Sequence, residues 1–152
     1  MIQVSAIFTI ILVFTILINP AFAITQLDRV DITNPRLVNA FGSKISERVN
    51  VNQQVQISAD IKNNQEKDQE FAYIVQIKNQ NNIIMSINWV IGSLDPGQTF
   101  SPALSWIPKA SGEYTVEIFV WDVENIVNND GKIAKIIKND ALAQYATLKI
   151  IS

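Results

Sequence analysis

The side chains of this chain that could perform chemistry are mainly carboxylates, because the sequence contains no histidine and no cysteine. This composition excludes Ser-His-Asp and Cys-His nucleophiles and every zinc or copper site that needs imidazole or thiolate. Two carboxylates can still hydrolyse a glycosidic bond when they flank a sugar-sized cleft, about 5 to 10 Å apart. Asp122 and Glu124 would share one side of an extended segment, but a small domain with short loops offers little room for a cleft. We therefore expect no catalytic residue and no enzymatic activity.

A calcium site is the second chemistry that this region could support. Four oxygen-bearing side chains fall on even positions of one short segment: Asp122, Glu124, Asn128 and Asp130. Oxygen ligands gathered in this way can surround Ca²⁺. Ile126 interrupts the series, and an EF-hand loop counted from Asp122 would carry Val127 at its glycine position and Ile133 in place of its bidentate glutamate. A solvated acidic turn is favoured, so we expect neither a metal nor a cofactor.

Aromatic side chains supply the candidate binding residues. Trp89 and Trp106 lie on alternating apolar faces, which predicts that both are core residues. If Tyr114 and the alternate residues up to Val120 face inward, Phe119 and Trp121 face outward and form a possible interaction patch. The alternative is that the connection from Val123 to Lys138 folds back and covers them. The sequence leaves these two outcomes open.

The elements that would position these side chains are strands, because apolar and polar residues alternate over short windows bounded by turn residues. Strands are expected over residues 55–61, 71–77, 83–91, 100–106, 114–120 and 146–150, with a first strand around 37–41 and a short one at 49–51. A hairpin turn is expected at 79–82, and Pro102 places its strand at an edge or a bulge. The pattern predicts one all-β domain, an antiparallel sandwich of about seven strands.

Two segments stand outside this pattern. Residues 24–36 are expected to be an N-terminal arm or linker, which leaves 37–152 as the domain. The connection from Asp122 to Asp140 contains a tight-turn signal at 128–131, followed by lysines beside isoleucines. The latter could form a helical turn or a ragged strand, and the sequence does not decide between them.

The N-terminal residues predict export. No charged residue precedes Asp28, and the apolar run Ala6–Ile18 is shorter than the about 20 residues that span a bilayer. Pro20 then breaks the helix before the small residues Ala21 and Ala23, so residues 1–23 are expected to be a signal-peptide helix cleaved after Ala23. Since no lysine or arginine precedes the apolar run, retention as a membrane anchor stays the alternative. Either outcome places the domain outside the cytoplasm.

Two motifs carry a resemblance to known families. The motif Ser111-Gly112-Glu113-Tyr114-Thr115-Val116 resembles the turn into strand F of immunoglobulin-like domains, with Val116 where those domains have a cysteine. The resemblance implies a disulfide-free immunoglobulin-like sandwich, in which the Tyr114 hydroxyl bonds to backbone a few residues upstream as a tyrosine corner. The run Val49–Asn63 resembles the opening strands of bacterial and archaeal surface domains, including the CARDB type. The chain is also similar in layout to small exported proteins of ammonia-oxidising archaea, whose role is largely uncharacterised, and its Pro-Gly, Trp, Gly-x-Tyr succession to a small bacterial proteinase-inhibitor sandwich.

The functional hypothesis is a non-catalytic module for protein interaction or a structural role, secreted or at the cell surface. A formal net charge of −2 leaves no basic footprint for nucleic acid. The expected partner is another exported or surface protein, and a membrane only if residues 1–23 remain as an anchor. The alternatives are a secreted proteinase inhibitor, with residues 92–102 as its loop, and a calcium- or glycan-binding module. The sequence leaves the oligomeric state open.

Overall fold

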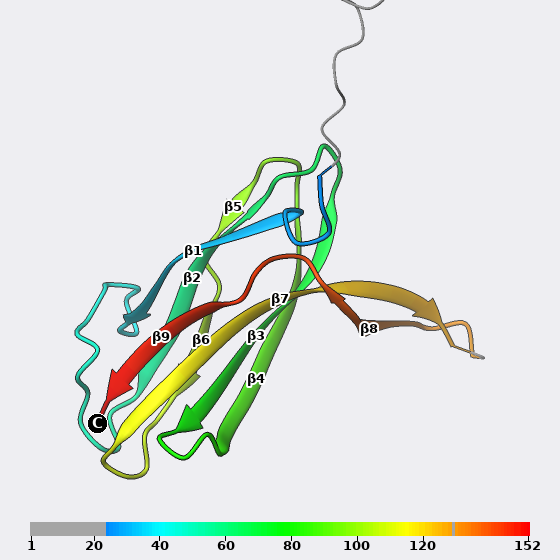
Figure 1. Ribbon diagram of the computed structural model, residues 1–152. Helices are drawn as coiled ribbons and strands as arrows, with labels where there is room; N and C mark the ends of the chain where they lie inside the picture. The colour runs from blue at the N-terminus through cyan, green and yellow to red at the C-terminus, as the bar shows by residue number, and fades with distance from the viewer. Residues whose placement is uncertain (1–23, 129) are drawn as a thin grey trace, which may run out of the picture.

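The computed structural model describes residues 24–128 and 130–152, so the expected signal peptide lies outside the described residues. Within these described residues, nine strands form two antiparallel sheets that face each other (Figure 1). The four-stranded sheet contains β1 (Val30–Val38), β2 (Val55–Asn63), β5 (Thr99–Phe100) and β6 (Ala103–Trp106). The five-stranded sheet contains β3 (Gln69–Asn79), β4 (Ile84–Leu94), β7 (Glu113–Val127), β8 (Ile133–Ala141) and β9 (Ala146–Ile151). The predicted all-β sandwich is confirmed, with nine strands where about seven were expected.

The core lies between the sheets and follows the alternation of the sequence. Three strands supply most of it: β2 with Val55, Ile57, Ala59 and Ile61, β3 with Phe71, Tyr73, Val75 and Ile77, and β7 with Tyr114, Val116, Ile118 and Val120. Successive side chains of a strand point to opposite faces, so these residues turn inward together. Val116, at the cysteine position of the resemblance, is fully buried. The cysteine-free core is therefore held by apolar burial and strand pairing.

Tyr114 makes the contact that a tyrosine corner implies. Its hydroxyl donates a hydrogen bond to the backbone carbonyl oxygen of Ala110, four residues upstream, at 2.7 Å. Trp106 packs edge-on against the Tyr114 ring, with ring centroids 4.9 Å apart, and lies half-buried against the core. This contact joins the end of β6 to the start of β7 across the two sheets.

The first strand was misplaced by the sequence prediction. It runs Val30–Val38 and not around 37–41, so residues 30–36 of the expected arm pair with β2. The reason is a bulge between Thr33 and Arg36, where Asn34 has a φ of 53°. The extra residue shifts the phase of burial from even to odd positions, which hides the alternation. The short strand expected at 49–51 is also absent: Val49 instead donates one backbone hydrogen bond to Ile151, at 2.9 Å.

The connection from Asp122 to Asp140, which the sequence left undecided, is a β-hairpin. β7 continues to Val127, the chain turns, and β8 returns antiparallel to it. The turn is closed by hydrogen bonds between Asn128 and Lys132 and between Gly131 and Asn128, each 2.8 Å. The hairpin projects from the body of the sandwich as an arm (Figure 1), which we call the β7–β8 arm.

The segment proposed as an inhibitory loop lies partly in strands. Residues 92–94 belong to β4 and residues 99–100 to β5, which leaves a turn at 95–98. Asn63 holds this turn, because its side-chain amide donates to the carbonyl oxygens of Leu94 and Asp95 at 3.2 and 3.1 Å. β5 and β6 both pair with β2 and are separated at Ser101 and Pro102, so Pro102 lies at a break in an edge, as expected.

Candidate interaction surface

The outward face of β4 is apolar, which reverses the orientation expected for Trp89. Residues that pair across a sheet share a face, and buried Val75 and Tyr73 of β3 pair with Asn88 and Val90 of β4. The side of β4 that carries Ser86, Asn88, Val90 and Gly92 is therefore the inner side, although Asn88 and Val90 stay exposed. Trp89 lies on the other side with 57% of its surface exposed, so its prediction as a core residue was wrong, whereas Trp106 does pack on the core.

Gly92 shows why β4 needs little bulk on its inner side. A Cβ atom at this position would lie 2.8 Å from Cζ of Phe71, closer than real side chains approach. The Phe71 ring thus fills the space beneath β4 that a larger β4 side chain would otherwise occupy. At this end of β4 the core is filled from β3, which leaves no room for a large β4 side chain on the inner side.

Two rows of cross-strand neighbours build the outer face of the five-stranded sheet. In the first row, Trp89 of β4, Ile74 of β3 and Phe119 of β7 are directly opposite one another. In the next row, Ile91, Ala72 and Trp121 occupy the equivalent positions. Side chains in such rows contact one another on one face of the sheet. The registry therefore brings Phe119 and Trp121 together with Trp89, which the sequence had assigned to the core.

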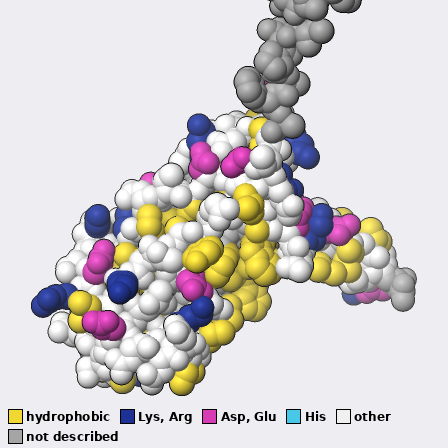
Figure 2. Space-filling view, in the orientation of Figure 1, with side chains coloured by type: hydrophobic (Ala, Val, Ile, Leu, Met, Phe, Trp, Pro, Cys, Tyr) yellow, Lys and Arg dark blue, Asp and Glu magenta, His cyan; other side chains and the backbone are white. Residues whose placement is uncertain are grey.

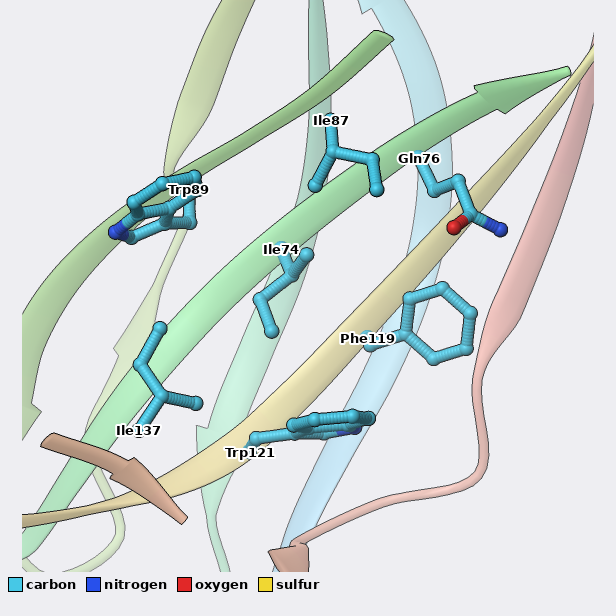
Figure 3. A pocket seen from close by; sticks show the side chains of 7 residues that line it. All are labelled: Ile74, Gln76, Ile87, Trp89, Phe119, Trp121 and Ile137. Carbon is cyan, nitrogen blue, oxygen red and sulfur yellow. The ribbon is translucent and has the colours of Figure 1, made fainter. Parts of the chain in front are cut away.

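These rows enclose a shallow groove of about 410 Å³ (Figure 3), which we call the apolar groove. Its lining comes from four strands and consists of Ile74, Gln76, Ile87, Trp89, Phe119, Trp121 and Ile137. Gln76 is the one polar residue of this lining, and its amide donates a hydrogen bond to Glu117 at 2.7 Å. Lys78 forms an ion pair with the same carboxylate at 2.9 Å. The polar groups at this end of the groove are therefore already engaged with each other.

Phe119 and Trp121 are partly exposed, which falls between the two outcomes that the sequence left open. The segment Val123–Lys138 forms the projecting arm, and Ile137 of β8 lines the groove beside Trp121. The two rings meet edge-on at 6.3 Å, and Tyr145 stacks on Phe119 at 5.5 Å. Tyr145 is 55% exposed and was not singled out from the sequence, where its loop position carries no periodic signal. Figure 2 shows hydrophobic side chains gathered below the β7–β8 arm.

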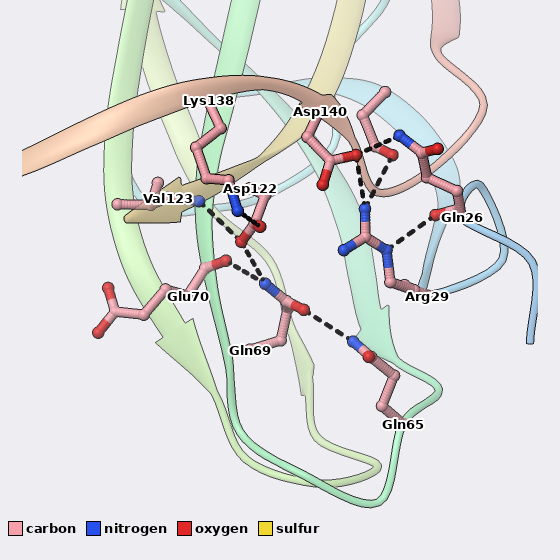
Figure 4. A network of polar contacts seen from close by, with 10 residues as sticks. Gln26, Arg29, Gln65, Gln69, Glu70, Asp122, Val123, Lys138 and Asp140 are labelled. Carbon is pink, nitrogen blue, oxygen red and sulfur yellow. Dashed lines mark hydrogen bonds and ion pairs between the residues drawn. The ribbon is translucent and has the colours of Figure 1, made fainter. Parts of the chain in front are cut away.

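The carboxylates considered for catalysis or calcium are dispersed. Asp122 lies at the base of the β7–β8 arm, where it accepts hydrogen bonds from Gln69 at 2.8 Å and Lys138 at 2.9 Å (Figure 4). Burial raises the pKa of Asp122, but the bonds from Lys138 and Gln69 outweigh burial and hold that pKa below its ordinary value. Glu124 is exposed on the arm, and Asp130 pairs with Lys132 at its tip. Across residues 24–128 and 130–152, no three acidic side chains are grouped to hold a metal ion.

A second polar cluster ties the N-terminal residues to the arm. The guanidinium of Arg29 donates to Asp140 at 2.8 Å, and the amide of Gln26 bonds to the same carboxylate (Figure 4). The first cluster connects strands β3, β7 and β8, and the second connects the residues before β1 to β8. Their side chains bind each other, so they act in holding the arm and leave the apolar groove as the surface suited to a partner.

The fold and this surface define the class of protein: an immunoglobulin-like β-sandwich with an apolar groove on one outer face. A family model described as S-layer A-like matches residues 15–134, so the chain belongs to the S-layer A-like family. This membership indicates a surface or structural module. In the described part of the chain, no helix has the length and apolar character that crossing a bilayer requires.

Solved structures agree with this fold at low sequence identity. The crystal structure of the C-terminal domain of Wzt is 15% identical, with 82% of this chain and 74% of that chain covered and a TM-score of 0.54. The CARDB domain of the PF1109 protein from Pyrococcus furiosus, a complex with di-metal ions, is 17% identical over 88% of this chain and 97% of that chain, with a TM-score of 0.47. Such likenesses concern the fold alone. No curated protein matches the sequence.

Proposed function

We propose that the protein is an exported, non-catalytic module of a cell-surface protein assembly, and that its apolar groove contacts a neighbouring protein. The observation that carries the proposal is the apolar groove itself, a row of exposed and half-exposed aromatics on the outside of a finished sandwich. Contiguous apolar surface of this kind on a soluble domain marks an interaction site. Membership of the S-layer A-like family supports a surface setting for that contact.

The chemistry of the groove favours a protein surface over a sugar. A glycan stacks on aromatic rings but also needs free polar groups to orient its hydroxyls. The amide of Gln76, the polar residue of the lining, is already bonded to Glu117. Tryptophan and phenylalanine are enriched at protein interfaces, where burying them contributes most of the binding free energy. An apolar side chain of a neighbouring protein is the occupant that the lining fits.

The proposal of a non-catalytic role rests on the composition and on the engaged carboxylates. The sequence supplies no histidine or cysteine nucleophile system. Asp122, which could have acted with Glu124, is bonded to Lys138 and Gln69, and its pKa lies below its ordinary value. A general acid needs the opposite shift, towards neutral pH. Asp122 therefore suits a structural role.

Binding to the cell envelope tests the proposed contact. The protein, produced from its full sequence and labelled, is titrated onto envelope fragments from which the native copy has been stripped. Wild type should bind saturably, and Phe119→Ser should lower the affinity about tenfold or more, because a half-buried aromatic anchor is lost. Trp121→Ser should act in the same direction.

The chain offers a matched control for this experiment. Phe41 is 93% exposed in a turn outside the groove, so Phe41→Ser removes the same side chain from elsewhere on the surface. Phe41→Ser should bind as wild type does. Equal binding by Phe119→Ser and wild type would show that the groove is not the contact face. Two results would overturn the protein-contact proposal. One is the absence of saturable binding by the wild type. The other is loss of wild-type binding when the envelope fragments are mildly deglycosylated and not otherwise changed.

Export is tested by the mature N-terminus. Mass spectrometry of the protein recovered from its native cells should find Ile24 as the first residue, outside the cytoplasmic fraction. Recovery of residues 1–23 in the membrane fraction would replace release with anchoring. Recovery in the cytoplasm would contradict the proposal as a whole.

A further inference from the structure

The edges of the two sheets differ in how they are protected. An edge strand presents unpaired backbone N–H and C=O groups, and proteins usually guard it with proline, charges, a bulge or a covering segment. β1 carries Pro35 together with the bulge at Asn34, and β5 and β6 are short and broken at Pro102. On the far side of the five-stranded sheet, β8 carries Lys135 and Lys138. β9 is covered at its end, where Ile151 exchanges backbone bonds with residues 47–49.

β4 has little of this protection. It pairs with β3 on one side, and no other strand in residues 24–128 and 130–152 pairs with its second side. Its 11 residues include no proline, and no residue from Asn79 to Leu94 is charged. A bulge at its start, between the pairs Ile77–Ser86 and Lys78–Ile84, leaves the remainder regular. β4 is thus a long, neutral and accessible edge, the kind of strand that pairs with another chain.

Backbone hydrogen bonds show which β4 backbone groups point away from β3. Asn79 donates its N–H to the carbonyl oxygen of Ile83 at 3.0 Å, so the odd-numbered residues of β3 turn their backbone groups toward β4. The hydrogen bonds beside β7 and β9 lead to the same assignment. Gly112 and Ser152 exchange backbone bonds of 2.8 and 2.9 Å, which turns even-numbered β7 residues toward β9 and odd-numbered ones toward β3.

The pairing of β3 with β4 then determines which β4 residues point their backbone N–H and C=O groups toward β3. Odd-numbered β3 residues are opposite even-numbered β4 residues, as in the pair Tyr73 and Val90. The backbone groups of the odd-numbered residues Ile87, Trp89 and Ile91 consequently point to the open edge. Their side chains lie on the apolar outer face, and Ile87 and Trp89 line the groove. Free backbone groups and apolar side chains thus belong to the same three residues.

We infer that β4 pairs antiparallel with β4 of a second copy of this chain, about a two-fold axis that passes beside Trp89. The inference goes beyond the proposed function, because this contact is made by the backbone edge of β4 and not by the apolar groove. Residue 89 is the centre of the strand 84–94, so this register gives the two copies full overlap. Ile87 then faces Ile91 of the other copy, and each Trp89 faces the other.

The strand is self-complementary in this register. On the outer face every pair in the centre is apolar with apolar, and on the inner face Ser86 meets Gly92 and Asn88 meets Val90. An isologous contact requires such a match of a patch with itself. No charge opposes its own copy, because the strand carries none. Two five-stranded sheets would become one continuous sheet, with both apolar grooves on the same side.

Oligomeric state and backbone substitution test the inference. The exported protein should sediment as a monomer–dimer equilibrium. Ile91→Pro removes an N–H that β3 does not use, and by symmetry two bonds of the dimer, so it should weaken dimerisation about tenfold or more with the fold intact by circular dichroism. Ile91→Thr keeps the N–H and the branched side chain and should still dimerise. A monomeric wild type, or equal dimerisation by both variants, would overturn the pairing.

Hydrogen exchange gives a readout that needs no variant. At low concentration the amides of Ile87, Trp89 and Ile91 should exchange fast and those of Ser86, Asn88 and Val90 slowly. Raising the concentration should protect the first set. Protection that does not change with concentration contradicts β4 pairing, even if a dimer forms elsewhere.

A spin label measures the register. The chain has no cysteine, so Ser93→Cys introduces a single labelling site. Residue 93 lies four residues from the axis on each strand, so the two labelled positions should be about 27 Å apart along the strands. Another separation would contradict the axis at Trp89. A monomer that still binds the envelope through Phe119 would refute the pairing and leave the proposed function standing. A dimer that does not bind the envelope would refute the proposed function and leave the pairing standing.

Discussion

The outer faces of the two sheets are built from opposite kinds of side chain. On the four-stranded sheet, β2 presents Gln56, Ser58, Asp60 and Lys62 outward, beside Thr33 and Arg36 of β1. On the five-stranded sheet, the equivalent positions hold Ile74, Phe119 and Trp89. Both faces lie outside the same core.

The polar face satisfies its own groups. The carboxylate of Asp60 accepts hydrogen bonds from Ser101 at 2.6 Å and Asn34 at 3.0 Å and pairs with Arg36 at 2.8 Å. These partners come from the β1 bulge and from the break between β5 and β6. The apolar face has no polar partners of this kind. Its exposed hydrocarbon costs about 25 cal/mol per Å² until another surface covers it. Substitutions on the polar face should therefore change stability, and those on the apolar face should change association.

Among substitutions on the polar outer face, Asp60→Ala should have the largest effect on stability. The substitution removes the carboxylate partner of Arg36, whose side chain is only 17% exposed, and leaves it the carbonyl oxygen of Asn34 at 2.9 Å as an acceptor; it also frees the two segments that Asp60 holds. Loss of a hydrogen-bonded charge of this kind costs about 2 kcal/mol. Urea unfolding measures the change. Asp31→Ala, an exposed carboxylate on the neighbouring strand, is the control and should change the free energy of unfolding by less than about 0.5 kcal/mol.

Tyr73→Phe should raise stability by about 1 kcal/mol. Tyr73 belongs to β3, but its hydroxyl is buried near Arg36 and the Ala59 backbone, without a hydrogen-bond partner among the described residues. Burial raises the pKa of this phenol. Removing the hydroxyl removes the free-energy cost of burying it without a hydrogen bond. A lower melting temperature for Tyr73→Phe would mean that the polar sheet satisfies this hydroxyl as well.

The Asp60 cluster also predicts the acid sensitivity of the fold. The hydrogen bond from Ser101 lowers the pKa of Asp60 below its ordinary value of 3.8; burial opposes this shift, and Asn34 and Arg36 add to it. A carboxyl whose pKa is lower in the folded state stabilises that state above the unfolded pKa, and the contribution is lost as pH falls through the folded pKa. The stability difference between wild type and Asp60→Asn should be constant above about pH 5 and shrink toward pH 2. A difference that persists at pH 2 would contradict the shift.

The sequence was sufficient for those parts of the fold where alternation and burial coincide. In β2, β3 and β7 the apolar face of each strand is the inner face, so the core residues and the sandwich were predicted from their spacing. Tyr114 was placed by the resemblance, because its motif is local. β1 was misplaced, since the bulge at Asn34 changes the phase within the strand. The bulge cannot be recognised from the alternation of apolar and polar residues alone.

The candidate site was predicted only in part, for a related reason. Phe119 and Trp121 were identified because β7 has a strongly apolar inner side that defines its outer side. β4 alternates just as clearly, but its apolar side faces outward, and the pattern of one strand does not tell which side meets the core. That choice depends on Phe71, which lies beneath Gly92 and comes from another strand. Tyr145 joins the surface through a loop, whose path no periodicity describes.

Trp89→Ala gives the smallest expected change in stability and separates the two faces most sharply. Trp89 is 57% exposed on an edge strand, so its removal should cost less than about 1 kcal/mol in urea unfolding. Trp106→Ala is the matched control, because it deletes the same side chain where it packs at 4.9 Å on Tyr114, and it should cost about 2 kcal/mol or more. Comparable losses for the two variants would mean that the outer face of β4 is part of the core after all. A loss confined to Trp106→Ala means that Trp89 contributes little to the folded monomer, and that its apolar surface is available for association.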